Sequence, residues 1–243
     1  MLSEFWPPTI LGRRRTRKSL SNFSIVNNRV LNEEIANIIR YRRENPRNAV
    51  DKDCIELAGQ VEGCDDVSIE EFVDQIKTML FAGHDTSASM LAWTYYFLST
   101  HPECLVKMKV EHQRIFGNNP SPDAIAKMIA DDPTILGKLH YTHAALKEAI
   151  RLKPVGDGVR AAPPKYIVCT RTGAEFDAGG TVMNIQHHGL HLKKDIWGED
   201  ADEFRPERFL TGQQIPVGYM PFSKRPRDCI GRNVAFIEVD IFQ

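Results

Sequence analysis

Apolar residues recur at helical spacing along most of the 243-residue chain. The clearest case predicts a long helix over residues 68–98, because its apolar residues share one face and Ser68 and Glu71 have the spacing of a capping box. The same periodicity predicts further helices over residues 24–43, 102–116, 123–129 and 141–152. The fold class predicted from this pattern is mainly α.

A small β part is predicted between the last of these helices and the C-terminal region. Residues 165–170 and 181–186 are β-prone, and the turn-rich residues 171–180 separate them, which predicts a hairpin with a long connection. Residues 1–20 lack periodicity and contain a basic run, which predicts a poorly ordered, solvated segment rather than a membrane-surface patch or targeting signal. We treat residues 1–243 as a single domain.

Composition narrows the functional classes. The net charge of −1 gives no electrostatic case for a nucleic-acid partner. No apolar run reaches the roughly 18 residues of a membrane-spanning helix, and no signal peptide is visible. The scattered, odd-numbered cysteines argue against a disulfide framework and for a reducing compartment; they are Cys54, Cys64, Cys104, Cys169 and Cys229.

The strongest candidate for chemistry is the loop of residues 222–231, where Cys229 lies beside arginines and just before an apolar, helix-like run. A helix N-terminus and nearby cations favour the thiolate form, which is a nucleophile or a metal ligand. Two alternatives stay open from the residues alone. The cysteine can be a buried structural residue, or the nucleophile of a hydrolase that pairs it with a histidine.

The other polar clusters are weaker candidates for a functional site when each is taken alone. The run over residues 82–87 puts glycine and short polar residues inside the long predicted helix, which indicates a functional segment, a kink or a buried polar patch. Glu148 and Arg151 lie one helical turn apart, as in an ordinary ion pair. His187, His188 and His191 suggest a metal site, but we favour a polar surface segment.

The cysteine loop resembles the haem-binding signature of the cytochrome P-450 family, F-x-x-G-x-R-x-C-x-G. Phe222, Arg227, Cys229 and Gly231 match it, whereas Arg225 stands where the first glycine is expected. The resemblance implies that the Cys229 thiolate is the axial ligand of haem iron. It also implies that Phe222 packs near the sulfur and that Arg227 faces a haem propionate.

Residues 82–87 resemble the oxygen-binding motif of the same family, A-G-x-D-T-[ST]. The resemblance implies that Gly83 leaves room for dioxygen beside the helix, and that Asp85 and Thr86 relay protons to it. Hydrogen-bonded acids and hydroxyls can perform such transfers. In addition, Arg160 occupies about the place of a propionate-binding arginine.

Residues 147–152 resemble the K-E-T-L-R-L helix of the family, and residues 206–209 resemble its P-E-R-F segment. The resemblance implies a structural triad of Glu148, Arg151 and Arg208 that supports the haem loop. All four motifs occur in the order that the family has.

The resemblance implies the C-terminal portion of the cytochrome P-450 fold, truncated at both ends, of the fungal or other eukaryotic microsomal type. The implied activity is a haem-dependent monooxygenase of secondary metabolism that inserts one atom of dioxygen into a small organic substrate. Electrons would come from NADPH through a reductase partner. The full-length protein would sit on the cytosolic face of the endoplasmic reticulum membrane, through an anchor absent here. The alternative is a truncated, catalytically incompetent fragment that binds haem or fails to bind it, which Arg225 favours.

Overall fold

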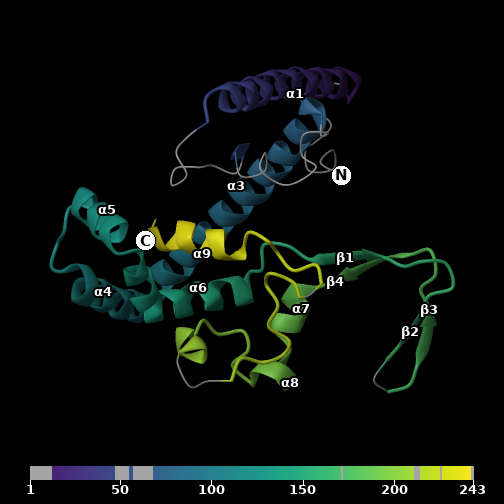
Figure 1. The fold of residues 1–243 in the computed structure, drawn as a ribbon. Helices are drawn as coiled ribbons and strands as arrows, with labels where there is room; N and C mark the ends of the chain where they lie inside the picture. The colour runs from purple at the N-terminus through teal and green to yellow at the C-terminus, as the bar shows by residue number, and fades with distance from the viewer. Residues whose placement is uncertain are drawn as a thin grey trace. The chain divides into compact units, whose positions relative to one another are not determined.

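A computed structural model describes residues 13–46, 55–56, 68–170, 172–210, 214–224 and 226–241, with side chains from residue 28 onward (Figure 1). The chain divides into two compact units, residues 1–82 and residues 83–243. Each unit is described by itself below. No helix in the described ranges has both the length and the apolar character needed to cross a membrane.

The first unit contains helix α1 (Arg13–Glu44) and the beginning of helix α3 (Ile69–Thr100). Its core packs Ile35 and Ile39 of α1 against Phe72, Val73 and Ile76 of α3. Helix α1 begins before residue 20, so residues 13–20 are helical where the sequence predicted a poorly ordered segment. Arginine and lysine are good helix formers, so an apolar stripe is not needed for this stretch to be helical.

The capping box predicted at the start of α3 is present. The Glu71 amide donates to Ser68 Oγ at 3.1 Å, and the Ser68 amide donates to Glu71 Oε2 at 3.2 Å. The two reciprocal bonds satisfy donors that a helix N-terminus leaves unpaired. From there α3 continues without interruption to Thr100, through the polar run of residues 82–87.

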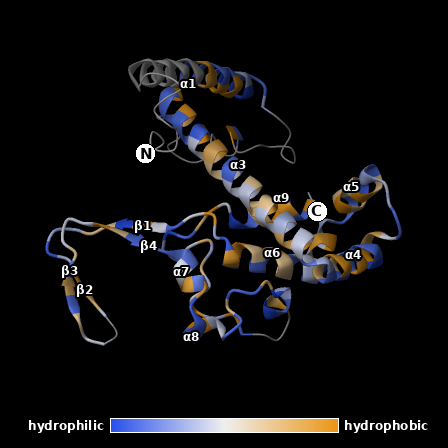
Figure 2. Cartoon of the chain, turned by 180° about the vertical axis from the view of Figure 1, so that it is seen from behind, coloured by the Kyte–Doolittle hydropathy of each residue, from blue (hydrophilic) through white to orange (hydrophobic). Residues whose placement is uncertain are grey.

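The second unit is built around helix α6 (His140–Leu152), most of whose side chains are buried. Three separate apolar clusters include α6 residues: one with helix α4 (Pro102–Phe116), one with helix α9 (Arg232–Ile241), and one with Trp197 and Phe209. A helix that is buried around most of its circumference acts as the centre of a domain. Figure 2 shows apolar residues along α4, α6 and α9.

Shorter elements complete this unit. Gly117, with φ of +91°, ends α4 as predicted. The remaining helical elements are α5 (Pro122–Asp131), the 3₁₀ helix η2 (Pro133–Lys138), α7 (His187–His191), α8 (Lys194–Trp197) and the 3₁₀ helix η3 (Pro206–Phe209).

The predicted strand pairing is wrong. Strand β2 (Ile167–Cys169) pairs antiparallel with β3 (Glu175–Asp177), and β4 (Val182–Ile185) pairs with β1 (Gly158–Ala161), where Gly158 faces Ile185. The chain reverses directly after β2, because the Thr170 amide donates to Ala174 O at 2.8 Å and Gly173 has a φ of +83°. The segment predicted as a long connection therefore supplies a strand of its own.

Candidate functional site

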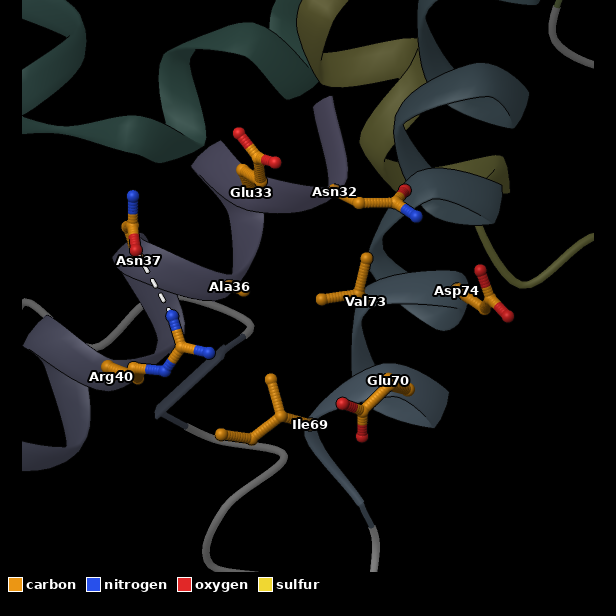
Figure 3. Close-up of a pocket in the computed structure, with 9 residues that line it drawn as sticks. All are labelled: Asn32, Glu33, Ala36, Asn37, Arg40, Ile69, Glu70, Val73 and Asp74. Atoms are coloured by element: carbon orange, nitrogen blue, oxygen red, sulfur yellow. Dashed lines mark hydrogen bonds between the residues drawn. The ribbon is translucent and has the colours of Figure 1, made fainter. Parts of the chain in front are cut away.

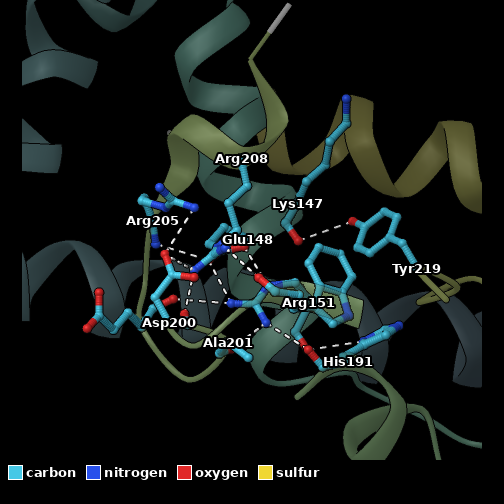
Figure 4. A network of polar contacts seen from close by, with 11 residues as sticks. Lys147, Glu148, Arg151, His191, Asp200, Ala201, Arg205, Arg208 and Tyr219 are labelled. Atoms are coloured by element: carbon cyan, nitrogen blue, oxygen red, sulfur yellow. Dashed lines mark hydrogen bonds and ion pairs between the residues drawn. The ribbon is translucent and has the colours of Figure 1, made fainter. Parts of the chain in front are cut away.

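A buried ion-pair network lies at the C-terminal end of α6 (Figure 4). Glu148 and Arg151 have side chains that are 0% exposed. Arg151 donates from Nε to Glu148 Oε2 at 2.7 Å and from Nη2 to Oε1 at 2.8 Å, which is the strong bidentate geometry. Arg208 of η3 donates from Nε to Glu148 Oε1 at 3.3 Å, and the Arg205 amide donates to the same oxygen at 3.0 Å. The structure thus brings together the three residues of the predicted triad.

The two arginines of the network also bind backbone carbonyls of neighbouring segments. Arg151 Nη1 donates to His191 O at 2.8 Å and to Ala201 O at 2.6 Å, and its guanidinium lies 4.8 Å from the ring centroid of Trp197. Arg208 Nη1 donates to Trp197 O at 3.1 Å, and its Nη2 contacts Asp200 Oδ2 at 2.7 Å. The network therefore fixes residues 191–208 around the end of α6.

His191 connects this network to the segment that leads into the cysteine loop. Its Nδ1 lies 3.1 Å from Arg151 O and donates to it, whereas Nε2 accepts from the Met220 amide at 3.0 Å. The prediction of a polar surface segment is wrong here, since His187 and His191 are both buried. They are buried because α7 folds back onto α6. Among the described residues no group of three or more His, Cys, Asp or Glu side chains could hold a metal ion.

We expect the free energy of unfolding to fall in mildly acidic solution because of His191. Burial is the main cause that lowers the pKa of His191 from 6.5 to about 4. Between these values the unfolded chain binds a proton that the folded chain excludes. The contribution of neutral His191 to the free energy of unfolding is therefore complete above pH 6.5. It is lost progressively as the pH falls towards 4, by about 3 kcal/mol.

Urea unfolding measured between pH 7 and pH 4 tests this expectation. His191→Gln keeps one donor and one acceptor but does not titrate, so it should flatten the pH dependence. An unchanged pH profile in the variant would assign the acid sensitivity to other groups.

The cysteine loop is closed by one backbone bond, in which the Cys229 amide donates to Phe222 O at 2.9 Å. Ser223 occupies the left-handed region with φ of +64°. The Phe222 ring lies 5.4 Å from that of Phe236, and the Arg232 guanidinium lies 5.9 Å from the Phe222 ring centroid. The loop is thus anchored on α9. Arg225 falls outside the described residues, so the effect of this arginine stays a prediction.

The surroundings of Cys229 suit a haem group. The thiol is exposed, and the neighbouring apolar side chains Ile230, Val234 and Ile237 are exposed as well, Ile230 by 94%. A soft thiolate donor flanked by apolar surface fits a flat, largely apolar iron macrocycle. A Cβ built at Gly231 would lie 3.8 Å from Cys229 Sγ, an ordinary contact, so packing does not require a glycine there.

The two arginines assigned to the propionates lie on different elements. Arg160 lies on β1, half-buried, and its Nη1 donates to Val159 O at 2.8 Å. Arg227 is exposed within the cysteine loop itself.

The polar run of α3 is exposed at Gly83, Asp85 and Thr86. A Cβ built at Gly83 meets no heavy atom within 4 Å. His84 Nδ1 lies 2.9 Å from Asp85 Oδ1. Ser87 Oγ donates to Glu238 Oε2 of α9 at 2.7 Å, a contact that joins the helix carrying residues 82–87 to the helix that follows the cysteine loop.

Sequence reasoning missed His84 and Glu238. The signal for His84 was its position inside the motif. Nothing local pointed to Glu238, whose partner lies far away in the sequence.

A separate groove of about 480 Å³ lies in the first unit between α1 and the start of α3 (Figure 3). Six of the nine lining residues are polar. Among them, Arg40 Nη1 donates to Asn37 Oδ1 at 3.1 Å. None of the residues that the motifs single out lines this groove.

Comparisons with known proteins agree with the motifs. The family model described as Cytochrome P450 matches residues 16–243. "Cytochrome P450 monooxygenase acrF" of Aspergillus aculeatus is 35% identical over 190 residues, which cover 70% of this chain and 38% of that protein. "Putative cytochrome P450 CYP13A7" of Caenorhabditis elegans is 34% identical, with 71% and 32% covered.

A crystal structure of a cytochrome P450, CYP102L1, is also similar. It has a TM-score of 0.76 and 28% identity, and the match covers 96% of this chain and 51% of that one. The chain thus spans about a third of the curated relatives and about half of the solved chain.

Proposed function

Because the chain belongs to the cytochrome P450 family, we propose that it forms part of a haem-thiolate monooxygenase that inserts one atom of dioxygen into an organic substrate. The observation that carries this proposal is the junction of α3 with α9. Ser87 donates to Glu238, and Met90 shares an apolar cluster with Val239. The polar run of α3 and the helix that follows Cys229 are therefore held against each other.

On the cysteine side, Cys229 is the proposed iron ligand. Its sulfur lies in the segment that leads into the N-terminus of α9, two residues from Arg227. Phe222 packs against α9 and holds the loop backbone through its carbonyl, and Gly231 starts the turn into the helix. Arg227 and Arg160 would bind the propionates as charge-assisted donors.

On the α3 side, a bound haem group would supply the chemistry that binds and activates dioxygen. The open space beside Gly83 supports its proposed role of leaving room next to the helix backbone. Asp85 would hold a proton on its carboxyl group and pass it to the Thr86 hydroxyl, with His84 beside it as a further proton-carrying group.

The other proposed properties belong to the whole protein. The substrate would be a small organic molecule, and electrons would come from NADPH through a reductase. Membrane association at the endoplasmic reticulum and a role in secondary metabolism follow the family resemblance. The supporting fact is the fungal monooxygenase among the relatives.

The test is the carbon monoxide difference spectrum of the reduced chain after expression with a haem supply. We expect a thiolate-type, red-shifted band that disappears in Cys229→Ser. Cys169→Ser removes another exposed thiol and should leave the band unchanged. A chain that holds no haem in any version would support the alternative of an incompetent fragment, and a band that survives Cys229→Ser would contradict the ligand assignment.

The same experiment tests the effect of Arg225, which differs from the family signature. A band that appears only in Arg225→Gly would assign the defect to the arginine in place of the signature glycine.

A further inference from the structure

The last turn of α9 carries a buried acid. The Asp240 side chain is 3% exposed, and its Oδ2 lies 2.6 Å from His143 Nε2 on α6. Its second oxygen, Oδ1, has no hydrogen-bond partner in the described part of the chain. A buried carboxylate that has a single partner depends strongly on that partner.

The other charged groups near this position are engaged elsewhere. On α9, Glu238 accepts from Ser87 of α3, and Arg232 lies over the Phe222 ring. On α4, His112 contacts Thr142 Oγ1 at 2.9 Å, and burial lowers the pKa of His112. The neutral form of His112 is therefore favoured, and the side chain that contacts Asp240 is that of His143.

Glu111 of α4 is also close to this region, but it faces the start of α6. Its carboxylate accepts from the Tyr141 amide at 2.7 Å and from the Thr142 amide at 2.9 Å. Both acceptor oxygens are thereby used, so Glu111 does not compete as a counter-ion for His143.

The pair holds α9 at residue 240, and the same helix begins at Arg232, shortly after Cys229. Residues 232 and 240 are about 12 Å apart along an α-helix. Glu238 binds α3, and Asp240, two residues further on, binds α6. The two side chains hold the C-terminal turn of α9 between these helices, and the helix transmits that position to the loop.

We infer that His143 and Asp240 are positioning residues, which set the position of the Cys229 thiolate by locking α9 onto α6. This role rests on the proposed haem-thiolate function. Neither residue touches the loop, so they act through the helix. Neither His143 nor Asp240 belongs to any of the four sequence motifs.

The experiment compares Asp240→Asn, His143→Leu and the double variant His143→Leu with Asp240→Leu. The first readout is hydrogen exchange of the loop, residues 222–231, in the haem-free chain. We expect exchange to be about tenfold faster in His143→Leu, which leaves the buried acid unpaired, and to return towards the wild-type rate in the apolar double variant. Asp240→Asn keeps the shape and should give a smaller effect of the same sign.

The second readout is the ratio of the thiolate-type to the thiol-type carbon monoxide band. Loss of the pair should shift this ratio towards the thiol-type band in His143→Leu, and the double variant should restore it. Asp123→Asn, which changes an exposed acid on α5, is the matched control and should leave both readouts unchanged.

The inference is overturned if the loop exchanges hydrogen at the wild-type rate in both His143→Leu and Asp240→Asn. It is also overturned if the effects of the two substitutions on this rate simply add in the double variant. The exchange measurement needs no haem. If haem fails to bind in every version, the proposed function fails, and the exchange result still decides whether the pair positions the loop. If His143→Leu does not fold, Asp240→Asn supplies the same comparison.

Discussion

Glu148→Gln is expected to destabilise the second unit by about 3–5 kcal/mol, because it removes the charge that balances a fully buried arginine. The amide keeps the size of the side chain but loses one acceptor oxygen. Arg151, Arg208 and the Arg205 amide all donate to the carboxylate of Glu148. At least one of these donors is then left without its partner, and the Arg151 charge stays buried.

The measurement is the midpoint of urea unfolding at neutral pH, followed by circular dichroism. The midpoint should fall, with little change in the slope, since the surface exposed on unfolding stays similar. Glu199→Gln is the matched control: its carboxylate pairs with Lys194 at 2.9 Å but is 91% exposed, so the expected cost is below about 1 kcal/mol. Equal effects of the two substitutions would show that the buried network adds no stability beyond a surface pair.

Features that depend on neighbouring residues were predictable from the sequence. The capping box at Ser68 and Glu71, and the glycine that ends α4, use atoms only a few residues apart. Helix α6 was predictable because its apolar positions and its turn-spaced Glu148 and Arg151 share one short segment.

Features that depend on distant partners were not predictable. The register of β1 with β4 joins Gly158 to Ile185, which are far apart in the sequence. The burial of His191 depends on α7 folding onto α6, so the local polar pattern suggested a surface segment instead. The motif resemblance supplied the triad and the cysteine loop, but it could not supply the Ser87–Glu238 and His143–Asp240 contacts between helices.

The second large effect concerns proton delivery. Asp85→Asn is expected to slow dioxygen reduction by the haem-loaded chain by about 10²–10⁴-fold, the range in which a positioned acid or base contributes to a rate. Asparagine keeps the size of aspartate and its ability to contact His84, but it cannot release a proton to Thr86. Asp85 and Thr86 are both exposed on α3, so solvent can return the proton to the aspartate in the native chain.

The readout is dioxygen consumption driven by a chemical reductant, measured in light and heavy water on samples with equal thiolate-type bands. The variant should be slow and should show a larger solvent isotope effect, because proton transfer then limits the rate. Ser99→Ala is the control on the same helix; its hydroxyl donates to Tyr96 O, away from the polar run, so its rate should match the native chain. If Asp85→Asn stays within about twofold of the native rate while its band is intact, Asp85 does not lie on the proton path, because the loss of a working acid is larger than that.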